Sequence, residues 1–404
     1  MKNTTYFLFF CFIGLFFATC KVPSFIEKKM VVFDTGFPVD RYAYGTWYDK
    51  KHKKEYIYFG SGADSARIRF FTLDGQRQSE IQDIPLLTNR GVEDVMDIGT
   101  IFVYDIDTVV VVDADDYTNQ MLYLNKKGER IHKIDFDTAF GTDKERYRVL
   151  YCANNTPNKP FLYLSCFWNW RNPRDSSFIG EFENELEYDK VYYKQQYDVP
   201  SVCKFDVRTN SYTFTETKMI PNYFLPNGDT SLIFKANTLI LGDMLESCYD
   251  HKLFIWLNES NKVLVLNPDN LRVEHTFEVG SNYVTVGAQP FPLSLRDKIK
   301  MRDEDFYEKG RICKVLYDKK RDLYYVVTRH KIPYEDFAFL TEASFSIHIY
   351  DAKLKKLSEQ YFEGGKYDYR FIFLTSQGLF IAQNENNKDY DPTKCKFFLF
   401  EIKQ

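Results

Sequence analysis

The sequence predicts an all-β protein: a six-bladed β-propeller of four-stranded antiparallel blades, closed by an N-terminal strand that completes the last blade. Three observations support this prediction. Aromatic residues make up 18% of the 404 residues, whereas Gly and Pro number only 19 and 14, and this balance favours strands. Two short sequence phrases recur along the chain. The last apolar run, Phe397–Phe400, has no further strand after it.

The first phrase is a strand, a polar turn with Asp or Asn, and then a dense apolar strand. Asp and Asn suit such turns because their side chains bond to nearby backbone groups. A continuous apolar run is typical of a strand that is buried on both faces. Each copy therefore predicts a hairpin in the interior. The six copies begin at Tyr48, Tyr104, Cys152, Cys248, Tyr317 and Phe373.

The second phrase is an apolar strand, a turn, and a more polar strand in which apolar and polar residues alternate. Alternation, as in Gln78–Ile81 or Arg272–His275, is typical of a strand with one exposed face. Together the two phrases define four-stranded units at a period of about 50 residues, lengthened by loop insertions, which fits propeller blades. A sandwich or two smaller β domains are the alternatives, although no linker-like change in composition divides the chain. The turn residues of the five full copies are Asp74, Asn125, Asp206, Asn267 and Asp351.

The segment Cys395–Glu401 corresponds to the third strand of a sixth unit, with Glu401 at the turn position. An unpaired third strand would expose a row of backbone donors and acceptors. Lys29–Asp34 is the remaining strand-like segment near either end of the sequence, so we expect it to supply the missing outer strand. This pairing would join the first and last blades of the ring.

Residues 1–20 have the character of a lipoprotein signal peptide. Lys2 is their only charge, and Phe7–Ala18 is almost wholly apolar, a length that suits a signal-peptide core and is too short to span a bilayer. Small residues precede Cys20, as in a bacterial lipobox, so Cys20 is the predicted lipidation site and membrane attachment. An ordinary secretory signal that contains a Cys is the alternative. We expect residues 21–28 to form a tether and residues 29–404 to form one propeller domain.

The lipobox, the tether and the six loosely repeated units resemble the exported six-bladed propeller lipoproteins of Bacteroidetes, and in particular the domain-of-unknown-function 4221 type family. The resemblance covers nearly the whole chain after the signal. It implies an uncharacterised lipoprotein of the cell envelope of a Gram-negative bacterium. Surface-exported lipoproteins of this group often carry acidic residues after the lipidated Cys. Lys21–Ser24 follow Cys20 here, which favours the periplasmic face over the cell surface.

Composition and spacing predict no catalytic residue, no metal site and no cofactor. The net charge is −4 and Lys and Arg are scattered, whereas nucleic-acid binding needs a clustered basic face, so nucleic acid is not an expected partner. The six His show no HxH or HExxH spacing, and GxSxG does not occur. The six Cys after the signal lack CxxC spacing, and buried free thiols are the default expectation, with disulfides left open. They are Cys152, Cys166, Cys203, Cys248, Cys313 and Cys395.

An insertion at about 167–200 carries the candidate ligand-binding residues. Trp168 and Trp170 alternate, so both rings could point to one face, with Arg171 and Arg174 beside them. Trp and Arg are frequent anchors of protein contacts, and aromatic rings serve as platforms for sugars. The alternative is that Trp168 extends its strand and packs against a neighbouring blade.

A second insertion, at about 280–310, contains helical spacing from Leu293 onward. It predicts a helix that caps one face of the ring or docks a partner. Overall, the sequence favours a lipid-anchored envelope module that binds a protein or a glycan and has no catalytic role. The alternative is a metal-dependent propeller hydrolase or lactonase with its site at the channel mouth. Such an enzyme would gather carboxylates and amides there, whereas a binding module would present an aromatic patch.

Overall fold

β-Strands make up most of the computed structural model in the part of the chain that it describes. That part comprises residues 22–39, 43–61, 67–78, 81–86, 98–113, 120–135, 147–153, 161–168, 197–198, 200–206, 208–216, 218–233, 247–249, 252–257, 259–295, 308–332 and 342–403. No helix within these ranges is both long and apolar enough to cross a membrane.

The strands of the described residues form six four-stranded antiparallel sheets. The first three sheets are β2 (Tyr44–Asp49), β3 (Lys54–Ser61), β4 (Arg67–Thr72) and β5 (Ile84–Pro85); β6 (Ile98–Asp105), β7 (Thr108–Asp113), β8 (Gln120–Leu124) and β9 (Arg130–Asp135); and β10 (Tyr147–Ala153), β11 (Phe161–Trp168), β12 (Val202–Asp206) and β13 (Ser211–Phe214). The next two are β15 (Ser247–Tyr249), β16 (Lys252–Trp256), β17 (Lys262–Leu266) and β18 (Val273–Glu278); and β20 (Arg311–Asp318), β21 (Leu323–Arg329), β22 (Phe345–Asp351) and β23 (Lys356–Phe362).

The sixth sheet has the order β1-β26-β25-β24 and joins β1 (Ser24–Asp34) to β24 (Tyr367–Thr375), β25 (Gly378–Gln383) and β26 (Lys394–Lys403). A small additional sheet pairs β14 (Leu232–Ile233) with β19 (Phe291–Pro292). The short helices are α5 (Met219–Phe224), η2 (Pro226–Gly228) and η4 (Leu293–Leu295).

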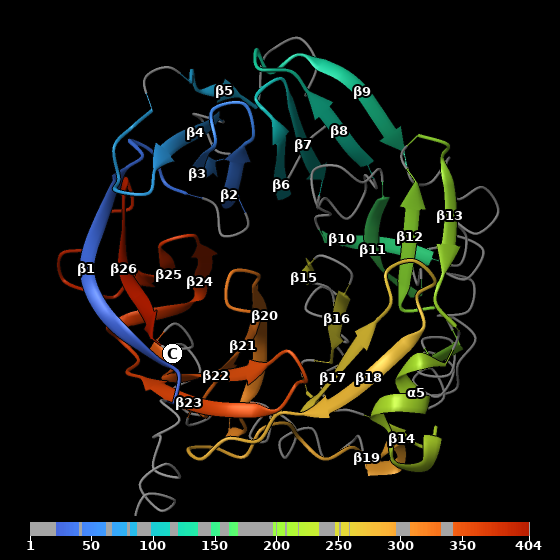
Figure 1. Ribbon diagram of the computed structural model, residues 1–404. Coiled ribbons are helices and arrows are strands. Elements are labelled where there is room, and N and C mark those ends of the chain that lie inside the picture. Colours follow the sequence, from blue (N-terminus) through green and yellow to red (C-terminus); the bar gives the residue numbers. More distant parts are fainter. Residues whose placement is uncertain are drawn as a thin grey trace, which may run out of the picture.

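The sheets are arranged in a ring around a central space (Figure 1). The first strands of neighbouring sheets contact one another, since β2 contacts β6 and β24, β6 contacts β10, and β20 contacts β15 and β24. The last strands lie at the periphery (Figure 1). The prediction of an all-β propeller arrangement is therefore confirmed.

The inner strands consist of consecutive apolar residues because both faces of each sheet are covered by a neighbouring sheet. On β16, Leu253 and Ile255 pack in a core cluster with residues of β11 and β12. The residues that alternate with them, Phe254 and Trp256, pack in another cluster with β20 and β21. Trp256 Nε1 also donates a hydrogen bond to the carbonyl of Ile312, at 3.1 Å. The core is thus a series of layers between sheets.

The fourth strands are more exposed than the others, as the alternating sequence predicts, and most residues of β9, β13 and β18 are exposed or half-buried. The first sheet departs from the expected position. Its fourth strand is β5, at Ile84–Pro85, rather than Gln78–Ile81. Asp83 accepts hydrogen bonds from Arg69 of β4 and from Arg77, and this carboxylate brings the following residues, Ile84 and Pro85, alongside β4.

The prediction that Lys29–Asp34 supplies the outer strand of the last sheet is confirmed. β1 pairs antiparallel with β26, and Phe33 lies opposite Cys395. The ring of Phe33 is fully buried and lies within 6.2 Å, centroid to centroid, of the rings of four phenylalanines. Two of these belong to the first sheet and two to the sixth: Phe59, Phe71, Phe380 and Phe397.

Two details of the closure correct the sequence prediction. β1 begins at Ser24, so the segment expected to be a tether, residues 21–28, is largely strand. The sequence did not indicate a strand there because only Phe25 of residues 24–28 is buried. The partners of this segment, the backbone of β26 and two side chains of β23, lie far away in the sequence. Glu401 lies inside β26, opposite Ile26, and not at a turn. No hairpin follows there because β1, the partner on that side, comes from elsewhere in the chain.

Much of both predicted insertions lies outside the described residues. In the second, Leu293–Leu295 forms the short helix η4, and Leu293 packs against the core between the third and fourth sheets. The longer predicted helix falls on residues 296–307, which lie outside the described part. Cys203, Cys313 and Cys395 are free thiols.

Candidate functional site

The candidate residues drawn from the sequence are only partly within the described chain. Trp168 is the last residue of β11, where its backbone lies opposite Tyr147, so it continues the strand. Trp170, Arg171, Arg174 and the predicted lipidation site, Cys20, lie outside the described residues. Their roles stay predictions.

Histidines and carboxylates do not form an evident metal site in the described ranges. No group of three or more His, Cys, Asp or Glu there is arranged to hold an ion. His52 is paired locally with Asp49 across the β2–β3 turn, at 2.5 Å. Two other histidines, His330 and His348, come together on the fifth sheet.

An aromatic platform stands out on the surface beside these two histidines. We define it as Tyr283, which follows β18, Tyr361 of β23, and His330, which follows β21. Tyr283 and Tyr361 are 55% and 43% exposed, although large apolar side chains are generally buried here. The two tyrosine rings lie 5.4 Å apart, and the imidazole of His330 lies 5.9 Å from Tyr283 and 5.4 Å from Tyr361.

Hydrogen bonds fix the orientation of this platform. Tyr361 Oη donates to Ser344 Oγ at 2.8 Å, and the backbone N–H of Gly364 donates to the same oxygen at 3.0 Å. His330 Nε2 lies 2.8 Å from Ser346 Oγ. Burial lowers the pKa of His330 and outweighs the attraction of Glu359, so its ring is neutral at neutral pH. The platform is therefore rigid and largely uncharged.

A buried carboxylate, Glu359 of β23, holds the segment that carries Tyr283. Ser281 Oγ and the backbone N–H of Asn282 donate to its oxygens at 2.5 and 2.9 Å. Lys356 Nζ donates to Glu359 at 2.8 Å and to the carbonyl of Gly280 at 2.6 Å. Burial alone would raise the pKa of Glu359, but these donors prevail and lower it to about 2. The carboxylate thus stays charged and anchors residues 280–282.

Beneath this anchor lies His348 of β22, which is fully buried. Its Nε2 lies 3.0 Å from Thr328 Oγ1, and its Nδ1 lies 3.9 Å from the Glu359 carboxylate. Burial lowers the pKa of His348 to about 4, against the opposing attraction of Glu359. A neutral imidazole with a nearby carboxylate is stable here because Lys356 already compensates the charge of Glu359.

The cluster contains the residue types of a serine hydrolase but not their arrangement. In a triad, one histidine bridges the hydroxyl and the carboxylate. Here His330 binds Ser346, whereas His348 faces Glu359, and Ser346 is 0% exposed. A substrate carbonyl has no access to that hydroxyl. The arrangement can support an aromatic surface but does not present a nucleophile.

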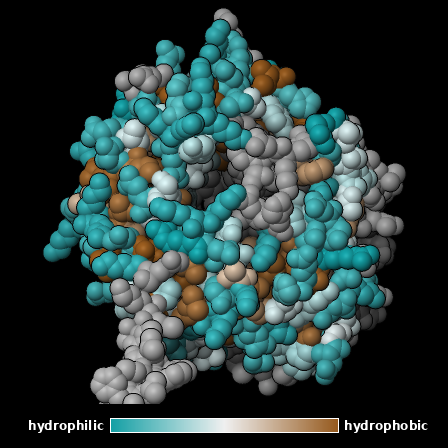
Figure 2. Space-filling model, viewed as in Figure 1, coloured by the Kyte–Doolittle hydropathy of each residue, from teal (hydrophilic) through white to brown (hydrophobic). Residues whose placement is uncertain are grey.

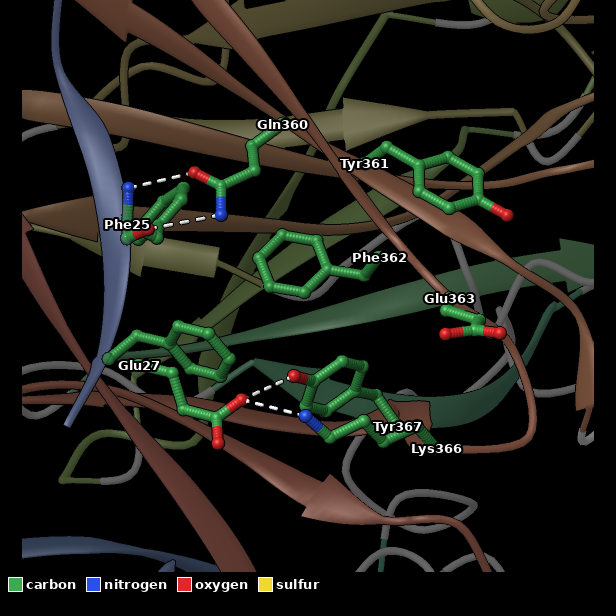
Figure 3. A pocket seen from close by; sticks show the side chains of 9 residues that line it. Phe25, Glu27, Gln360, Tyr361, Phe362, Glu363, Lys366 and Tyr367 are labelled. Atoms are coloured by element: carbon green, nitrogen blue, oxygen red, sulfur yellow. Dashed lines mark hydrogen bonds and ion pairs between the residues drawn. The ribbon is translucent and has the colours of Figure 1, made fainter. Parts of the chain in front are cut away.

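A groove of about 510 Å³ lies on the opposite face of β23, between β23, β24 and β1. Figure 3 shows Gln360 directed to the backbone of Phe25 and Glu27 directed to Tyr367 and Lys366, with the ring of Tyr361 pointing away. The Gln360 amide accepts from Phe25 N at 2.9 Å and donates to Phe25 O at 3.1 Å. Most polar groups of this groove are thus used to hold β1 in place.

A second cavity, of about 190 Å³, adjoins β24 and β25. Arg370 lies on its wall, and its guanidinium is bonded to Asp368 at 2.6 Å and to Glu385 at 2.9 Å. Its charges are therefore paired internally. Of these three features, the aromatic platform is the one whose side chains remain open for a ligand.

The sequence prediction missed the platform because its residues come from two sheets. Tyr283 lies in the second predicted insertion, and Tyr361 lies in a strand predicted only as solvent-facing. One signal was available in the sequence. Tyr361 lies two residues after Glu359 in an alternating strand, so the aromatic ring and the carboxylate lie on the same face of the sheet.

The fold and the surface define an all-β propeller that carries an exposed aromatic platform. No protein-family model and no curated protein matches the sequence. Among solved structures, a member of the DUF4221 family from Bacteroides vulgatus is similar over 95% of this chain and 99% of its own, with a TM-score of 0.63 and 18% identity. A protein of Bacteroides fragilis described as exported is similar over 96% of this chain and 97% of its own, with a TM-score of 0.53 and 9% identity.

These identities show the fold alone. At that level, the resemblance to the domain-of-unknown-function 4221 type is confirmed.

Proposed function

We propose that this protein is a lipid-anchored binding module of a bacterial cell envelope and that the aromatic platform holds its ligand, a protein or a glycan. In this proposal the six four-stranded sheets are the six blades of one ring. The ring serves as a rigid scaffold and performs no catalysis.

The exposed tyrosine pair is the observation that carries the proposal. Tyr rings offer a large apolar surface with a polar tip, at a low cost in conformational entropy, and for this reason they recur at protein and sugar interfaces. Glu359 and Ser344 fix the pair before any ligand arrives. Such preorganisation lowers the entropic cost of binding.

The envelope location rests on the sequence and on the similar proteins. An apolar segment with a signal-peptide core precedes Cys20, and one structurally similar protein is described as exported. In this proposal Cys20 carries the lipid. The periplasmic side is favoured because Lys21–Ser24 contains no acidic residue.

A binding assay with matched variants tests the role of the platform. The probes are peptidoglycan fragments, lipopolysaccharide oligosaccharides and purified envelope proteins, presented on an array to the chain without its signal. Tyr283→Ala combined with Tyr361→Ala is expected to weaken binding of the recognised probe by roughly tenfold or more, the usual effect of truncating aromatic hot spots. Tyr48→Ala, at an exposed tyrosine of the first sheet, is the control and should bind normally.

Equal binding by the double variant and the wild type would contradict the proposal. So would a wild-type protein that binds none of the probes. Stoichiometric calcium or zinc in the purified protein would instead favour the hydrolase alternative.

A further inference from the structure

The early start of β1 places the ring very close to Cys20. Only three residues, Lys21, Val22 and Pro23, separate Cys20 from Ser24, the first residue of the strand. Four residue steps of fully extended chain reach about 14 Å at most. A lipid on Cys20 would therefore hold the beginning of β1 within about 14 Å of the membrane surface.

The beginning of β1 is itself fixed to the ring. Ser358 Oγ donates to the carbonyl of Pro23 at 2.6 Å. Gln360 binds both backbone groups of Phe25, whose ring is buried between the fifth and sixth sheets. The body of the propeller must therefore follow wherever the lipid holds this strand.

β1 and the residues just before it carry an unusual share of exposed apolar side chains. Nine large apolar side chains are exposed in the described residues, and four of them lie within eleven consecutive positions: Val22, Ile26, Met30 and Val32. Figure 2 shows apolar patches at the left edge of the molecule, where β1 runs in Figure 1. Two exposed lysines lie between these side chains: Lys29, and Lys28, whose Nζ lies 2.5 Å from Glu401 Oε2.

We infer that the rim formed by Val22–Val32 lies against the surface of the same bilayer that holds the lipid. This inference rests on the lipid attachment proposed above. Apolar side chains beside an exposed lysine such as Lys29 suit the boundary of headgroups and acyl chains, because the lysine stem lies in the apolar layer while its ammonium group reaches the phosphates.

A strand from a partner protein fits this edge less well. β1 has a bulge between Glu27 and Lys29, and bulges and edge lysines both hinder further strand pairing. The first part of the edge is already covered by side chains of β23, through the bonds of Ser358 and Gln360. A bilayer needs no register and tolerates both features.

Hydroxyl-radical footprinting of the whole chain tests this orientation. The sample is the lipidated protein on vesicles of phosphatidylethanolamine and phosphatidylglycerol, and its mass establishes the lipid. The reference is the unlipidated chain that begins at Lys21, in the same vesicle suspension. Met30 is 47% exposed. On the vesicles its rate of oxidation is expected to fall by a factor of roughly three or more, because oxidation follows exposure. Ile131 of β9, 54% exposed, is the control and should react equally in both samples.

A variant of the rim tests whether slower oxidation of Met30 reflects contact with the bilayer and not a general shielding of the protein by the vesicles. Met30→Ser with Val32→Ser changes only exposed positions and should leave the fold intact. It should release lipidated protein from the vesicles severalfold faster than Ile131→Ser does.

The outcomes separate the inference from the proposed function. Lipidated protein that binds vesicles while Met30 reacts as fast as in the reference overturns the membrane-facing rim and leaves the anchor standing. A mature protein whose mass contains no lipid overturns both.

Discussion

At the scale of single residues, Glu359 links the structure of the ring to the platform. Its carboxylate accepts hydrogen bonds from Ser281, Asn282 and Lys356, and it lies near His348. One strand residue therefore fixes a loop that follows another sheet. Removing such an acceptor would leave several buried donors unsatisfied, which costs more than the hydrogen bonds themselves contribute.

The buried histidine predicts a loss of stability in mild acid. His348 binds a proton below about pH 6.5 in the unfolded chain but only below about 4 in the folded protein, because burial lowers its pKa. Between these values the unfolded chain binds more protons, so the free energy of unfolding falls as the pH falls. The loss from His348 should approach roughly 3 kcal/mol at pH 4. His330, whose pKa is also lowered, adds to it.

Urea unfolding between pH 7 and pH 4.5 measures this effect. Glu359 contributes little in that window because its carboxylate stays charged in both states until the pH falls below about 4.5. His348→Gln should flatten the dependence, while His132→Gln, at an exposed position of β9, should leave it unchanged. A slope that is identical in wild type and His348→Gln would contradict the assignment.

At the scale of elements, the sequence predicted strands well where burial itself produces the pattern. β16 and β21 are continuous apolar runs because both of their faces are covered. Ser24–Lys28 was not predicted, since only Phe25 is buried and the partners of this segment, β26 and side chains of β23, lie more than 300 residues away. The platform was missed for the same reason: Tyr283 and Tyr361 meet only after two sheets are in place.

Shortened chains test the contribution of the first half of β1. A chain that begins at Val22 should be as stable as the mature protein. A chain that begins at Lys29 loses the burial of Phe25 and the bonds of Gln360, and should be less stable by about 3–5 kcal/mol, the usual cost of removing a buried Phe. A chain that begins at Thr35 loses Phe33 as well and leaves the outer edge of β26 unpaired, so it should not fold stably.

Thermal unfolding followed by circular dichroism ranks the three chains. Equal midpoints for the chains that begin at Val22 and Lys29 would mean that residues 24–28 contribute nothing and that the expected tether was correct.

At the scale of the whole molecule, the ring is held closed by noncovalent contacts between β1 and β26. Among the described residues, the other five four-stranded sheets are each built from consecutive strands, so each could form locally, whereas the sixth needs strands from far apart in the sequence. Closure of so long a loop is entropically costly and slow. We therefore expect the opening of this sheet to limit the stability of the ring.

A disulfide across the closure tests that expectation. Ser24 and Lys403 are opposite residues of the β1–β26 pair, and opposite residues of antiparallel strands lie within the Cα separation that a disulfide spans. In Ser24→Cys with Lys403→Cys, the oxidised protein should be more stable than the reduced protein by about 2–4 kcal/mol. Ser24→Cys alone should respond to neither oxidant nor reductant. If the bond forms, as judged by mass, and the urea midpoint stays the same, then β1 detaches without opening the rest of the ring, and the ring does not depend on this closure for its stability.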